Sequence, residues 1–151
     1  RRSWWKHTGM PQEKQRVYYL SPDHKTIITV IDDLVKPNGI IGTPDGKTLY
    51  VADPGGKTTW SFAINPDGSL GNKKLFCNMG SDGMTIDVKG NVYLTGSGVT
   101  VFDKTGRELG NIQVPEKWTA NVCFGGKERR DLYITASKGL YRIRMNVRGA
   151  Y

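Results

Sequence analysis

Three polar residues occupy matching places in three similar segments of the chain. Asn38 opens NGIIGTPDGKTLYVAD, Asp82 opens DGMTIDVKGNVYLT and Asn121 opens NVCFGGKERRDLYITA. Amide and carboxylate oxygens are hard ligands that suit Ca²⁺ or Mg²⁺ and accept other divalent ions. If the three segments are neighbours in space, their first residues converge, and the chemistry they predict is the binding of a shared cation.

Plain turn chemistry is the alternative interpretation of two of these positions. Asn38-Gly39 and Asp82-Gly83 are also the commonest residue pairs of β-hairpin turns. Here each pair precedes the first strand of a repeat rather than lying between two paired strands, which favours a site. The glycines would let the backbone of a neighbouring segment approach closely.

The elements that must position these residues are short strands separated by turns. Turn sequences such as TPDGK, NPDGS and DKTG recur, because Pro presets the first turn residue and Gly tolerates positive φ. Between them lie segments rich in β-branched and aromatic residues, including TLYVAD, TTWSFAI, NVYLT and LYRIRM. No stretch of ten residues has a helical period, so the sequence predicts an all-β fold.

The spacing of the repeats favours one all-β architecture. Asn38 and Asp82 lie 44 residues apart, and Asp82 and Asn121 lie 39 apart. A period near 40 residues with four short strands is typical of a β-propeller blade, whereas a β-sandwich would not explain the recurrence of one motif in phase. We expect blades to start near residues 38, 82 and 121. Residues 15–33 would form the outer half of an earlier blade, and residues 1–14 an irregular loop.

A propeller of about three and a half blades leaves open edges, which natural proteins normally cover. Residues 15–151 are therefore predicted to be the C-terminal part of a propeller domain. The remaining blades would come from a missing N-terminal half or from another chain.

Composition excludes several other classes of function. The net charge is +8, but the basic residues are scattered singly along strands and loops with no aromatic-basic pattern, so we expect no nucleic-acid partner. Apolar runs are far too short for a membrane span, and no membrane association is expected. The two cysteines have neither metal-site nor disulfide-framework spacing. We expect a soluble protein, and the sequence does not distinguish a cytoplasmic from a periplasmic location.

Three stretches carry a family resemblance: DLVKPNGIIGTPDGKTLYVAD, GSDGMTIDVKGNVYLTGSGVTVFDKTG and TANVCFGGKERRDLYITA. They resemble, in order and spacing, blade openings of the senescence-marker-protein/gluconolactonase/luciferin-regenerating-enzyme family, and in particular bacterial-type gluconolactonases. The resemblance covers roughly residues 15–148. It implies a six-bladed propeller of four-stranded antiparallel blades, of which this chain is the C-terminal half, with one catalytic divalent metal ion at the channel.

The resemblance also assigns roles to residues. Asn38 and Asp82 match two of the metal ligands, and Asp82 matches the carboxylate that acts as general base. Asn121 matches a strand start that is not usually a metal ligand; it would lie behind the ligands or in the channel, where it could contact substrate. Ca²⁺ is the first expectation for the metal, with Mg²⁺, Mn²⁺ and Zn²⁺ as alternatives. The family's site also uses a glutamate and a further polar residue from blades that precede residue 1.

The implied reaction is hydrolysis of a small-molecule sugar lactone, in which the metal ion polarises the carbonyl group and water attacks it. No separate nucleophile is required, and the sequence contains no G-x-S-x-G motif.

The segment RRSWWKHTGM is the predicted lid over the channel. Arg2, Trp4 and Trp5 could bind a sugar acid through cationic donors and aromatic stacking, or the tryptophans could pack against the next blade. Two alternatives to a lactonase stay open at this point. One is a non-catalytic propeller scaffold that binds a protein partner, and the other is an organophosphatase-like esterase that uses the same metal site.

Overall fold

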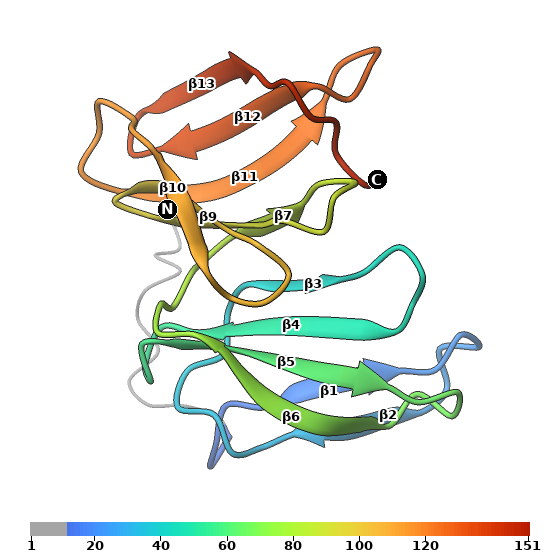
Figure 1. Cartoon of the computed structure of the whole chain (residues 1–151). Helices are drawn as coiled ribbons and strands as arrows, with labels where there is room; N and C mark the ends of the chain where they lie inside the picture. The colour runs from blue at the N-terminus through green and yellow to red at the C-terminus, as the bar shows by residue number, and fades with distance from the viewer. Residues whose placement is uncertain (1–11) are drawn as a thin grey trace, which may run out of the picture.

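The computed structural model of the protein describes residues 12–151, and every regular element in that range is a strand (Figure 1). None of the described segments is a helix long and apolar enough to span a membrane. The strands fall into four antiparallel sheets that follow one another along the chain. The first is a hairpin of β1 (Val17–Leu20) and β2 (Ile27–Ile31).

Two sheets of four strands and one of three follow this hairpin. One four-stranded sheet contains β3 (Ile40–Gly42), β4 (Thr48–Asp53), β5 (Thr58–Ile64) and β6 (Leu70–Cys77). The other contains β7 (Met84–Ile86), β8 (Val92–Gly96), β9 (Gly98–Phe102) and β10 (Glu108–Ile112). The last sheet contains β11 (Thr119–Gly125), β12 (Asp131–Ala136) and β13 (Gly139–Arg144).

Each of these sheets is a meander whose strands pair in sequence order, as in a propeller blade. The first strands of successive sheets contact one another, β3 against β7 and β7 against β11. The sheets therefore share one inner side, formed by β3, β7 and β11, and their later strands spread away from it (Figure 1).

Apolar side chains pack between successive sheets rather than within one central core. Three clusters fill the three interfaces. Strand β4 sends Tyr50 and Ala52 toward the β7–β10 sheet and Val51 toward the β1–β2 hairpin. Successive residues of a strand point to opposite faces, so a strand covered on both sides needs apolar residues at consecutive positions. This requirement explains the near-continuous apolar runs of β4 and β8.

The segment after β13 turns back across the ends of the inner strands. Val88 N donates to Arg148 O at 3.1 Å, and Ala150 N donates to Ile86 O at 3.1 Å. The Tyr151 hydroxyl then donates to Gly42 O at 2.6 Å, at the end of β3. Residues 145–151 thus bridge all three large sheets at the end where β3 and β7 finish.

Candidate metal centre

Asn38 and Asp82 come together at the opposite end, where β3 and β7 begin. Each lies two residues before its strand, and Asn38 Nδ2 donates to Asp82 Oδ1 at 2.8 Å. Asn38 is exposed and Asp82 is half-buried. Two side chains that are 44 residues apart in sequence therefore contact each other at an accessible surface.

The backbone around Asn38 is bound to its own sheet and to the next one. Asn38 N donates to Ala52 O at 2.9 Å, and Gly39 N donates to Ser81 O at 3.1 Å. A Cβ atom on Gly39 would lie 3.0 Å from Ser81 O and 3.3 Å from Asp82 O. A side chain at position 39 would therefore press on the backbone that carries Asp82, because the two sheets approach so closely there.

Buried hydroxyl groups fix the backbone on both sides of Asp82. Ser81 and Thr95 are 2% and 0% exposed. Thr95 N donates to Ser81 Oγ at 2.8 Å, and Gly83 N donates to Thr95 Oγ1 at 3.0 Å. Ser81 Oγ donates in turn to Gly83 O at 2.6 Å. The residues before and after Asp82 are thereby attached to β8, and the carboxylate has a defined position.

Asn121 differs from the expectation that it opens a strand. Strand β11 begins two residues earlier, at Thr119, with a shift of register between Thr119 and Asn121. Thr119 pairs with Ala136 at the start of the β11–β12 ladder, and its fully buried hydroxyl lies within hydrogen-bond distance of Gly96 O, at 2.9 Å, and of Gly98 O. The Asn121 side chain lies against Gly83, and its Oδ1 accepts from Val122 N at 2.8 Å. Asn121 is beside Asp82 in the fold, but it makes no hydrogen bond to Asn38 or Asp82 among the described contacts.

Asp53, at the end of β4, helps to position the loop that carries Asn38. The carboxylate is 2% exposed and accepts from Gly56 N at 3.1 Å, which caps the turn that follows β4. It also accepts from Val35 N at 2.9 Å and Lys36 N at 2.7 Å, in the loop that leads to Asn38. Burial raises the pKa of Asp53, but these backbone N–H groups favour the ionised form and leave the pKa below its ordinary value.

The proposed lid residues Arg2, Trp4 and Trp5 lie outside the described residues, so the lid stays a prediction. Within residues 12–151, no three side chains of His, Cys, Asp or Glu cluster closely enough to hold a metal ion. The described part of the site therefore offers one carboxylate and one amide. Both carry hard oxygen atoms, and both face solvent.

Residues 3–138 match the family described as SMP-30/gluconolactonase/LRE-like region. The chain belongs to this family. It is 30% identical over 148 residues to the gluconolactonase of Zymomonas mobilis, covering 88% of this chain and 41% of that protein. It is 28% identical over 173 residues to a lactonohydrolase of Aspergillus oryzae, covering 95% of this chain and 39% of that protein.

The structure of a gluconolactonase from Xanthomonas campestris superimposes with a TM-score of 0.81 at 32% identity, covering 91% of this chain and 46% of the other. The predicted β-propeller fold is confirmed, and the described sheets correspond to about three and a half blades. This SMP-30/gluconolactonase/LRE-like chain spans less than half the length of each of these three relatives.

Proposed function

We propose that this chain forms part of an enzyme that hydrolyses a small-molecule lactone, with Asn38 and Asp82 at the reacting centre. The observation that carries the proposal is the contact between these two side chains at 2.8 Å across two sheets, at an accessible end of the inner strands. Its relatives support the reaction class, because they include a gluconolactonase and a lactonohydrolase.

Asn38 and Asp82 are the residues that would hold a divalent cation. Ca²⁺ binds six to eight oxygen atoms and accepts both amide and carboxylate donors, so the pair fits Ca²⁺ but supplies only part of its ligand shell. Mg²⁺, Mn²⁺ and Zn²⁺ also accept such ligands. A bound cation of this kind would polarise the lactone carbonyl group and stabilise the negative charge that develops on its oxygen.

Asp82 is the residue in position to handle the proton. Its carboxylate orients a water molecule and accepts the proton as the water oxygen bonds to the carbonyl carbon. The ring C–O bond then breaks, and the proton passes to the released ring oxygen, so one water is added and a hydroxy acid is formed. Asn38 holds the carboxylate through its Nδ2–H. Asn121, which lies against Gly83, would contact the substrate, together with Arg2, Trp4 and Trp5 of the predicted lid.

The rest of the propeller is a required partner in this proposal. Among the described strands, β1 pairs only with β2, and β13 pairs only with β12. Further blades, on the same polypeptide or on another chain, would close the ring and supply the remaining cation ligands.

The test is substitution of Asp82 in the complete protein, as Asp82→Ala and as Asp82→Asn. Cation content after dialysis and hydrolysis of glucono-1,5-lactone at constant pH are measured. We expect a loss of hydrolysis of at least about 100-fold for both variants, the scale of general-base catalysis. Cation content should fall for both and fall further for the alanine variant.

Asp32→Ala is the matched control, because Asp32 is an exposed carboxylate outside this centre. It should leave both measurements unchanged. If Asp82→Ala retains both the cation and the hydrolysis, the enzyme proposal is wrong and a scaffold becomes the better description. If the parent protein hydrolyses an aryl ester or a phosphotriester but not the lactone, and Asp82→Ala loses that activity, the esterase alternative is favoured.

A further inference from the structure

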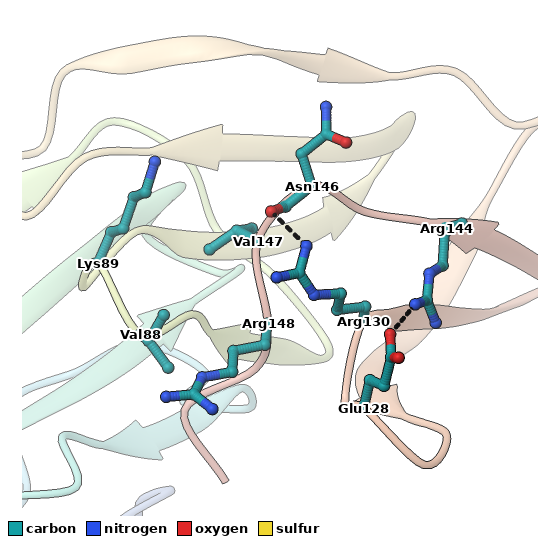
Figure 2. Close-up of a pocket in the computed structure, with 8 residues that line it drawn as sticks. All are labelled: Val88, Lys89, Glu128, Arg130, Arg144, Asn146, Val147 and Arg148. Atoms are coloured by element: carbon teal, nitrogen blue, oxygen red, sulfur yellow. Dashed lines mark hydrogen bonds and ion pairs between the residues drawn. The ribbon is translucent and has the colours of Figure 1, made fainter.

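A pocket lies at the end of the inner strands away from Asn38 and Asp82. It is bounded by the β7–β8 turn, the β11–β12 turn and the segment that follows β13 (Figure 2). Its volume is about 520 Å³, within the range of small-molecule sites. Strand β7 separates the two places, since Asp82 precedes it and Val88 follows it.

Hydrogen bonds between backbone groups hold the walls of this pocket together. Met145 N donates to Arg130 O at 2.8 Å, Gly149 N donates to Arg129 O at 2.8 Å, and Val88 N donates to Arg148 O at 3.1 Å. Arg130 Nη1 also donates to Asn146 O at 3.0 Å, as Figure 2 shows. The three segments are therefore fixed relative to one another, and the pocket is part of the folded structure.

The lining is strongly cationic. Lys89, Arg130, Arg144 and Arg148 contribute four positive charges, and Glu128 contributes the single negative one. Glu128 forms an ion pair with Arg144, which also lies 3.6 Å from Asp131. Within residues 12–151, no carboxylate pairs with the side chains of Lys89 or Arg148. Like charges gathered in one concavity repel one another and attract a counter-ion.

An adjoining groove gives the pocket a partly apolar extension. Its volume is about 500 Å³, and Lys89, Arg144, Asn146 and Val147 line both spaces. Its other walls include Val101, Leu109, Ile112 and Met145. A ligand that fits both spaces has an anionic group at one end and an organic body at the other.

We propose that this pocket binds a phosphate-bearing small molecule at a site separate from the candidate metal centre. The lining carries three more positive than negative side chains, which exceeds what a monocarboxylate would neutralise. A phosphoryl group carries up to two negative charges and three acceptor oxygens, and it matches the fork of donors that each guanidinium presents.

The test uses the complete protein and two phosphate probes, inorganic phosphate and glucose 6-phosphate, with gluconate as the carboxylate comparison. Binding is measured by titration calorimetry at low ionic strength. We expect saturable binding of both phosphates, at least about tenfold tighter than gluconate. The double variant K89A/R148A should weaken phosphate binding at least about tenfold.

The matched control is K25A/R107A, which removes one lysine and one arginine from exposed turns elsewhere. It should bind phosphate within about twofold of the parent. Asp82→Ala should also bind phosphate normally, so failure here and failure of the proposed lactonase are distinguishable. The inference is overturned if the parent shows no saturable phosphate binding, or if K89A/R148A and the control bind equally. Binding of a DNA duplex without binding of phosphate would overturn it as well.

Discussion

Asp82 depends on two hydroxyl groups that its own side chain does not contact. Ser81 Oγ and Thr95 Oγ1 lie 3.1 Å apart, and both are buried. They hydrogen-bond to Gly83 N and Gly83 O, the backbone groups of the residue that directly follows the carboxylate. A reacting group is useful only where its position is defined, so these hydroxyls are positioning residues for the proposed reaction.

Thr95→Val should remove this support with almost no change in shape. Gly83 N would then lose its buried acceptor, which costs about 1–3 kcal/mol. We expect the free energy of unfolding, measured with urea, to fall by that amount. Lactone hydrolysis at saturating substrate should fall in the folded fraction, because the backbone at Asp82 loses its attachment to β8.

Thr29→Val is the control for this prediction, since Thr29 is an exposed threonine of β2. It should change stability by less than about 0.5 kcal/mol. If the two substitutions change the free energy of unfolding equally, the hydrogen bonds of the Thr95 hydroxyl make no measurable contribution to stability.

The sequence predicted the Asn38–Asp82 contact but not the hydroxyls beneath it. The contact followed from a repeat whose first residues had to converge. Thr95 gave no comparable signal, because threonine is common in strands for reasons of packing alone. Asn121 was placed in the right neighbourhood, yet β11 begins earlier, where Thr119 pairs with Ala136 of β12. The pairing partner of a residue in another strand cannot be predicted from one segment alone.

At the scale of elements, Asp53 connects the end of β4 to the loop that carries Asn38. Asp53→Asn replaces one carboxylate oxygen with an NH₂ group and removes the negative charge. At least one of the backbone N–H groups that face Asp53 then loses its acceptor. We expect a loss of about 1–3 kcal/mol in the free energy of unfolding at pH 7. Asp67→Asn, in an exposed turn, should cost less, about 0.5 kcal/mol.

The same substitution should alter the dependence of stability on pH. The pKa of Asp53 is lower in the folded protein than its ordinary value of 3.8. Its contribution is therefore fully present above pH 3.8 and is lost as the pH falls through the folded pKa. The stability difference between the parent and Asp53→Asn, measured by urea unfolding, should shrink from pH 7 toward pH 3. A difference that stays constant would show that ionisation of Asp53 is irrelevant.

In the two four-stranded sheets, the sequence identified the middle strands better than the outermost ones. Strands β4 and β8 are covered on both faces, so each contains a consecutive apolar run, residues 49–52 and 92–94, that is easy to recognise. Strand β10 is mostly exposed, and the middle of β6 is exposed as well. An outer strand with solvent on one or both sides needs no apolar alternation, so the existence of β6 and β10 followed only from the four-stranded architecture.

At the scale of the molecule, the described sheets bury three interfaces but leave the last sheet uncovered on its far face. Tyr141 of β13 packs into the cluster shared with β8, whereas Leu140, on the opposite face, is 70% exposed. Ile27 of β2 is 70% exposed as well. Uncovered apolar faces and an unpaired edge strand favour association with another chain.

We therefore expect the isolated 151-residue chain to self-associate as its concentration rises, as measured by sedimentation velocity. Leu140→Lys should reduce this association. Leu109→Lys is the control, because Leu109 is 50% exposed in β10 of a complete sheet and should have little effect. A monomer at all concentrations, or equal effects of the two lysines, would contradict the prediction.

The returning C-terminal segment has a mechanical consequence. The β3–β6 and β7–β10 sheets share one apolar interface, with Asn38 and Asp82 touching at one end and Tyr151 joined to Gly42 at the other. The hydrogen bond from Tyr151 thus helps to fix the orientation of the β3–β6 sheet at the end of this interface opposite the two oxygen-bearing side chains.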